Sequence, residues 1–198
     1  NANTTGSLNT GVGRAALGKN TVGQNNSSFG HGSLTDNTTG SNNIAVGHNA
    51  LSNNTTANDN VAVGSYALKS NTTGANNVGV GVSALVANTT ASNNTAVGSD
   101  ALTANTTGTA NVAVGYQALY TATTQSYNTA VGTGALYTSA AENGTAVGYY
   151  ALVNNTTGAE NTALGRSALQ ANTTGANNVA IGAYALDANT TADRNVAI

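Results

Sequence analysis

The sequence predicts an all-β fold, a parallel β-solenoid or β-roll, formed by residues 1–198 as a single repeat region. Three observations carry this prediction: a 17-residue period, apolar columns that stay constant while the charged positions vary, and turn-forming residues in every repeat. The period gives about 11–12 rungs. A single rung buries too little apolar surface to stand alone, so stability must come from the stacking of neighbours.

The period is set by a glycine that follows an apolar residue in every repeat, here called the column glycine. The column glycines are Gly13, Gly30, Gly47, Gly64, Gly81, Gly98, Gly115, Gly132, Gly148, Gly165 and Gly182. Each interval is 17 residues except the one from Gly132 to Gly148, which is 16. The unit reads approximately N-[VT]-A-V-G-x-x-A-L-x-x-N-T-T-G-x-N.

Within this unit, "NVAVG" predicts a strand of about five residues, because it is β-branched and bounded by Asn and Gly. "ALxx" is a second, weaker strand candidate, and "NTTGxN" has the composition of a closing turn. The column glycine predicts a bend that needs positive φ or a close approach of two chains. We expect the Leu, Val and Gly columns to face inward, because no charged residue falls in them.

Two columns are expected to form ladders along the rod. The Asn column, four residues before the glycine, should stack its amides at strand spacing and hydrogen-bond along the axis. The Leu column, four residues after it, should fill the core. The central members of the two ladders are Asn43, Asn60, Asn77, Asn94, Asn111, Leu51, Leu68, Leu85, Leu102 and Leu119.

Composition excludes several classes of function. Charged residues make up 6% of the chain and the net charge is −2, with no basic stripe, so we expect no nucleic-acid partner. No apolar run is long enough to span a membrane. With no Cys, the chain has neither a disulfide framework nor a thiolate metal site. The last repeat ends before its "GxxAL", so we expect a segment of a longer protein.

The repeats also resemble a known family. "NIAVG" (Asn43–Gly47) and "NVAIG" (Asn178–Gly182) are similar to the head repeats of YadA-like trimeric autotransporter adhesins and to the repeat arrays of phage-type tail fibres. The resemblance implies β-rolls packed three side by side, in an adhesive or spacing fibre at the cell surface or on a virion. The adhesin repeat is shorter than 17 residues, which leaves the trimeric packing open.

From these patterns we expect a non-enzymatic structural shaft of an extracellular fibre, with no catalytic residue, cofactor or metal, and a homo-oligomeric assembly. The alternative is an adhesin head that contacts a glycan or receptor through exposed tyrosines. The tyrosines gathered in the irregular zone between residues 116 and 150 are Tyr116, Tyr120, Tyr127, Tyr137, Tyr149 and Tyr150. Ordinary decay of the repeat would also explain that zone, where Ala122 and Ser139 replace the Asn of "NTT".

Two polar features carry weaker hypotheses. Nine Asn-Thr-Thr segments, including those at Asn37, Asn71 and Asn105, are N-glycosylation acceptors by sequence. Stacked about 4.8 Å apart they are too close for a glycan on every rung, so a ladder of turn residues is favoured. Stacked Thr also suggests an ice-binding face, although Thr-Thr offers only one rank of hydroxyls to any face.

Two further motifs are better explained as structure. His31 and His48 share a variable column on consecutive rungs but have no third ligand, which favours ordinary exposed surface over a metal site. The "GVG" from Gly79 to Gly81 lacks the lysine of a phosphate loop and fits the strand pattern.

Overall fold

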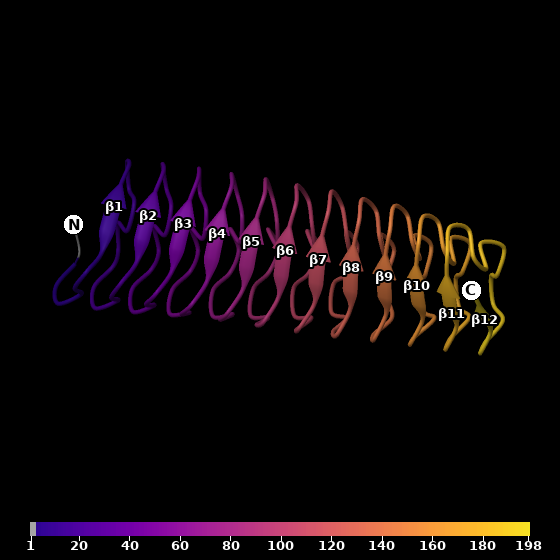
Figure 1. The fold of residues 1–198 in the computed structure, drawn as a ribbon. Coiled ribbons are helices and arrows are strands. Elements are labelled where there is room, and N and C mark those ends of the chain that lie inside the picture. Colours follow the sequence, from indigo (N-terminus) through magenta and orange to yellow (C-terminus); the bar gives the residue numbers. More distant parts are fainter. Residues whose placement is uncertain (1–2) are drawn as a thin grey trace.

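A computed structural model describes residues 3–198 as an elongated coil of twelve strands, with the two termini at opposite ends (Figure 1). The strands form one parallel sheet in chain order, and the described residues contain no helix, so the predicted β-solenoid is confirmed. The strands are β1 Thr10–Val12, β2 Ser27–Phe29, β3 Ile44–Val46, β4 Val61–Val63, β5 Val78–Val80, β6 Thr95–Val97, β7 Val112–Val114, β8 Thr129–Val131, β9 Thr145–Val147, β10 Thr162–Leu164, β11 Val179–Ile181 and β12 Val196–Ala197.

Successive strands pair in the register that the repeat predicts. Ile44 lies opposite Val61 and Val46 opposite Val63, so each column of the sequence becomes a straight row on the rod. The 16-residue repeat keeps this register, because Thr129 pairs with Thr145. Its missing residue is therefore taken up by the turns rather than by the sheet.

The second strand predicted at "ALxx" is absent, and that prediction is wrong. The residues after each column glycine form turns, because the Leu column adopts the left-handed conformation, with φ near 50° at Leu51 and Leu68. The residue two positions after the glycine does the same, as at Tyr66 with φ 62°. Left-handed residues bend the chain and cannot extend a strand, so each rung has one strand only.

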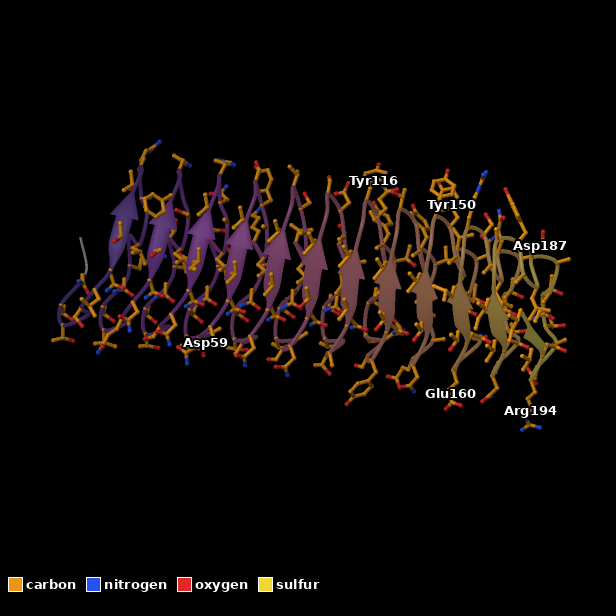
Figure 2. All side chains as sticks on the ribbon, viewed as in Figure 1. Asp59, Tyr116, Tyr150, Glu160, Asp187 and Arg194 are labelled. Atoms are coloured by element: carbon orange, nitrogen blue, oxygen red, sulfur yellow. The ribbon has the colours of Figure 1, made fainter. Side chains whose placement is uncertain are left out.

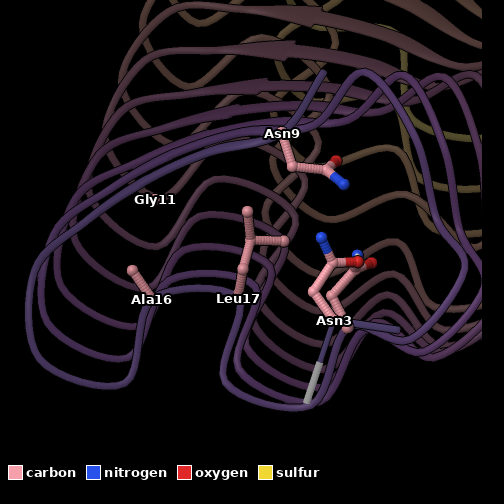
Figure 3. A pocket seen from close by; sticks show the side chains of 6 residues that line it. Asn3, Asn9, Gly11, Ala16 and Leu17 are labelled. Atoms are coloured by element: carbon pink, nitrogen blue, oxygen red, sulfur yellow. The ribbon is translucent and has the colours of Figure 1, made fainter. Parts of the chain in front are cut away.

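The interior is narrow and is filled by Leu and Ala. Leu51, Leu68, Leu85, Leu102 and Leu119 are all fully buried. Opposite them lies the middle residue of each strand, which is buried from β2 to β11 and is Ala on most rungs. The close view of the first turn shows Leu17 pointing across the coil toward the strand wall near Gly11 (Figure 3).

The Val column was expected inside and lies outside, so that expectation is also wrong. In β4 the middle residue Ala62 is fully buried, while Val61 and Val63 on either side of it point outward. Neighbouring residues of a strand point to opposite faces, so Ala and Val cannot both enter the core. The small residue goes inward because a Leu from the opposite wall occupies the same space.

The column glycine makes the expected bend. All eleven column glycines have φ between 121° and 140°, a range that strongly favours glycine. A Cβ on Gly47 would stand 2.5 Å from the carbonyl oxygen of Gly64 on the next rung. Stacking and bending together therefore require glycine here.

Buried asparagines hold the turns together in two ladders. In the column before the strand, Asn43 donates its backbone N–H to Asn26 Oδ1 at 2.9 Å and its side-chain Nδ2 to the Ala57 carbonyl at 2.8 Å. The same pattern repeats at Asn60, Asn77, Asn94 and Asn111. The second ladder consists of the Asn of "NTT", and its amides donate to the amide oxygen of the preceding rung where that rung also carries Asn.

Candidate functional site

One side of the rod is an uninterrupted outward strand face, made of the residues one and three positions before each column glycine. The residues three positions before the glycine are Thr10, Ser27, Ile44, Val61, Val78, Thr95, Val112, Thr129, Thr145, Thr162, Val179 and Val196. The residues one position before it are Val12, Phe29, Val46, Val63, Val80, Val97, Val114, Val131, Val147, Leu164, Ile181 and Ile198.

The strand face combines exposure with an apolar surface and no charge. Ile44 is 41% exposed, Val46 is 37% exposed and Leu164 is 46% exposed. None of the face positions is Asp, Glu, Lys, Arg or His. Parallel sheets are normally covered on both faces, and contiguous apolar patches on a protein surface mark interaction sites. The strand face is therefore the main candidate for a functional surface.

Two edges of different chemistry border the strand face. The tyrosine edge consists of the two residues after each column glycine, and the acidic edge consists of the residues five and six before it. Tyr116 and Tyr150 project from one side of the row of strands, and Asp59 and Glu160 project from the other (Figure 2). Both His and two of the three Arg lie on the tyrosine edge, whereas four of the seven acids lie on the acidic edge.

The six tyrosines predicted as a contact zone do not form one surface. Tyr116, Tyr149 and Tyr150 lie on the tyrosine edge. Tyr127 lies on the acidic edge, on the far side of the strand face. The remaining two, Tyr120 and Tyr137, form a separate stacked pair with ring centroids 5.1 Å apart, five residues after their column glycines.

The strongest aromatic cluster includes two residues that sequence reasoning missed. The Cζ atom of Arg166 lies 6.0 Å from the centroid of the Tyr149 ring and 5.4 Å from that of the Tyr184 ring. The ring centroids of Tyr149 and Tyr150 are 4.2 Å apart. Desolvation, and then the hydrogen bond with Tyr150, raises the pKa of the Tyr149 hydroxyl above its ordinary value. Alignment of columns, rather than distance along the chain, would have revealed this cluster.

The histidine pair lies farther along the same edge. His31 and His48 are stacked with ring centroids 5.3 Å apart, and the Tyr66 ring meets His48 edge-on at 5.1 Å. Within residues 3–198 there is no group of three His, Cys, Asp or Glu side chains arranged to hold a metal ion. The pair is thus part of an aromatic edge.

The asparagines of the sequons point into the coil. Asn37, Asn71 and Asn105 are all fully buried. The Nδ2 of Asn37, for example, donates to Asn20 Oδ1 at 2.8 Å and to the Gly40 carbonyl at 2.9 Å. An amide nitrogen that is buried and donates two hydrogen bonds is not accessible to glycosylation in the folded coil. These residues therefore act in the turn ladder.

This second ladder is interrupted at one place. Ala122 and Ser139 replace two consecutive asparagines, and Asn105 Oδ1 is buried without a hydrogen-bond partner. A shallow hollow of about 180 Å³, lined by hydroxyl groups that include Thr121 and Thr138, lies on the outside of this region. Asn105 does not line it, so the hollow and the orphan oxygen are separate features.

A second hollow, of about 100 Å³, lies at the first turn (Figure 3). It is lined by Asn3, Asn9, Leu17 and Asn20 among others, which belong to columns that are buried on later rungs. It is the interior of the coil at its first turn and not a separate ligand site.

No family model, curated protein or solved structure matches this chain. In the part of the chain that the structure describes, no helix is long and apolar enough to cross a membrane. The candidate site therefore depends on the geometry of the strand face and its edges.

Proposed function

We propose that the chain is the non-enzymatic shaft of an extracellular fibre, in which several copies pack side by side along their strand faces. The observation that carries this proposal is the strand face itself, an uncharged band over all twelve strands in which the row one before the glycine is apolar throughout and the row three before it is half Val or Ile and half Thr or Ser. A monomer in water would leave that band uncovered, and burial of apolar surface is the main driving force of association.

The size of the face supports self-association. Twelve strands at about 4.8 Å, each about 10 Å wide over its three residues, give roughly 600 Å² per chain. A stable interface buries about 800 Å² on each partner. The face together with its two edges approaches this area, and every added rung enlarges it, so a long rod associates more strongly than a short one.

The coil itself is suited to a spacing role. Each rung is bonded to the next through the sheet, and most rungs also through the two asparagine ladders, so the rod is stiff along its length. The resemblance to surface-fibre repeats supports a location outside the cell, at the cell surface or on a virion appendage, and a chain without Cys is compatible with it.

The second candidate function is glycan or receptor binding by an adhesin head. The cluster of Tyr149, Arg166 and Tyr184 favours it, because two aromatic rings and a guanidinium are exposed together on one edge. Such a group suits stacking on a sugar ring and pairing with an anionic substituent. Loss of binding to a glycan array after Tyr149→Ser and Tyr184→Ser changes, with an unchanged circular dichroism spectrum, would favour this function.

An ice-binding face is the remaining alternative. The strand face carries Thr on three consecutive rungs at Thr129, Thr145 and Thr162, but Val and Ile interrupt that row elsewhere. The exposed Thr of "NTT" forms a single row on another side, since its neighbour bonds its hydroxyl to the next rung, as Thr38 does to the Thr55 carbonyl at 3.0 Å. Absence of thermal hysteresis at micromolar protein would exclude this function.

The proposed shaft is tested by the mass of the particle in solution. Light scattering of the wild type should give a multiple of the 19.3 kDa chain mass. Changing Val63, Val97 and Val131 to Lys places charge on the face without touching the core, and we expect the chain to become monomeric.

The matched control places three lysines on exposed residues away from the face and its edges, at Val22, Thr73 and Thr107, and should remain oligomeric. Circular dichroism verifies that both triple variants keep the β fold. A monomeric wild type, or a face variant that keeps the wild-type mass, would contradict the proposal.

A further inference from the structure

The strand β10 carries opposite charges at its two ends. Glu160 precedes Thr162–Leu164 by two residues on the acidic edge, and Arg166 follows by two residues on the tyrosine edge. Both side chains are exposed. Across residues 3–198 the ion pair that forms is Lys19 with Asp36, at 2.8 Å, so neither Glu160 nor Arg166 has a charged partner within its own chain.

The two groups cannot meet each other within one chain. They lie on opposite sides of the strand face, and the three residues of β10 between them alone span about 10 Å. Both groups are therefore free to pair with charges on a second molecule that covers the strand face.

The direction of that second molecule decides which edges meet. If two rods lie parallel, related by a rotation about an axis along the rod, the tyrosine edge of one copy meets the acidic edge of the next at the same height. If two rods lie antiparallel face to face, with their long edges aligned, each edge meets its own kind. The acidic edge of one copy, which carries Asp59, Glu142 and Glu160, would then lie against the same edge of the other copy, which like-charge repulsion disfavours.

We infer that copies of this chain assemble in parallel and in register around an axis along the rod, with Arg166 of one copy paired with Glu160 of its neighbour. The inference rests on the proposed function, because it names the partner edges of the same self-associating face. The contact is heterologous, because different edges of the two copies meet. Such contacts form a closed ring when the rotation between neighbouring copies divides a full turn evenly.

The other rungs agree with this register. At the same height, Tyr66 on the tyrosine edge faces Asp59 on the acidic edge, and the edge residues around His31 and His48 face asparagines. No rung brings two like charges together. Rows of Tyr and His opposite Asn allow hydrogen bonds across the seam, and the β10 rung adds an ion pair that marks the register.

Disulfide trapping tests the pairing. Because the sequence has no Cys, only the introduced cysteines can form a disulfide. A variant with both Glu160→Cys and Arg166→Cys is oxidised at low concentration and analysed on a non-reducing denaturing gel. Covalent multimers that disappear under reduction are expected, because cysteines within one chain lie beyond the 7 Å limit for Cα atoms of a disulfide. The matched control, Asp59→Cys with Arg166→Cys, moves the acidic-edge cysteine six rungs away and should remain uncrosslinked.

The outcomes separate this inference from the proposed function. Crosslinking by Arg166→Cys alone would show that like edges meet and would overturn the parallel arrangement. An oligomer by light scattering whose cysteine pair does not crosslink would overturn the pairing but leave the shaft intact. A monomer by light scattering would overturn the shaft, and the pairing with it.

Charge reversal gives a second, independent readout. Arg166→Glu should shift the midpoint of oligomer dissociation to at least several-fold higher protein concentration, and adding Glu160→Arg to the same chain should restore it. A double variant no better than Arg166→Glu alone would overturn the pairing, because a merely structural role of Arg166 would not be rescued from the opposite edge.

Discussion

Replacing a single buried asparagine of the second ladder should destabilise the rod well beyond an ordinary surface change. Asn71 donates to Asn54 Oδ1 at 3.0 Å and to the Gly74 carbonyl at 2.9 Å, and its own Oδ1 accepts from Asn88 at 2.8 Å. Asn71→Ala removes three hydrogen bonds worth about 1 kcal/mol each. It also leaves Asn54 Oδ1 buried and unpaired, which adds about 1–3 kcal/mol. We expect a loss of about 4–6 kcal/mol in the free energy of unfolding.

Urea unfolding monitored by circular dichroism measures the loss, and hydrogen exchange should localise it to the rungs on either side of Asn71. The control is Thr73→Ala, two residues away on an exposed position of the same turn, which should change stability by less than about 0.5 kcal/mol. Equal effects of the two substitutions would refute the view that the amide ladder holds the turns.

Three further predictions concern the interior. Changing Ala122 and Ser139 to Asn together should raise the melting temperature, because the ladder regains about 2 kcal/mol of hydrogen bonds; an unchanged melting temperature would contradict this. Gly47→Ala should cost more than about 3 kcal/mol in urea unfolding, because it combines strain at φ 137° with a 2.5 Å clash, whereas Gly79→Ala should be nearly neutral, because its Cβ would meet nothing closer than 3.3 Å. Leu102→Ala should cost about 2–5 kcal/mol, since Leu102 is fully buried, and a smaller loss would mean that the core can collapse around the gap.

The sequence was sufficient for the period, the strand, the register and the bend at the glycine. These features depend on local rules, because β-branched residues favour strands and a residue with φ near 137°, as at Gly47, is almost always glycine. The 16-residue repeat was also visible, and the structure adds that its deletion falls in a turn.

The direction of the Val column was not predictable from apolarity alone. Both Ala62 and Val63 are apolar, and the alternation of a strand says only that one of them faces inward. The choice depends on the width of the coil, which is set by the Leu of the opposite wall. Under the proposed side-by-side packing another copy covers the outward Val column, and a single sequence does not display that copy.

The left-handed conformation of the Leu column could not be predicted from the residue type. Such a conformation costs a non-glycine residue about 1–2 kcal/mol, and Leu is not among the residues that adopt it readily. It is maintained because Leu51 and its equivalents are buried and their backbone N–H groups bond to the next rung, as Leu51 does to the Ala67 carbonyl at 3.0 Å. Tertiary packing here overrides local preference.

The asparagine ladders have a consequence for how such coils join end to end. Asn37, Asn54, Asn71 and Asn88 all donate toward the N-terminal neighbour, so their amide dipoles point one way along the rod. A cut through these rungs would expose amide donors on one surface and amide acceptors on the other. Two coils would therefore match only head to tail, and a filament built from them would have a polarity, with two chemically different ends.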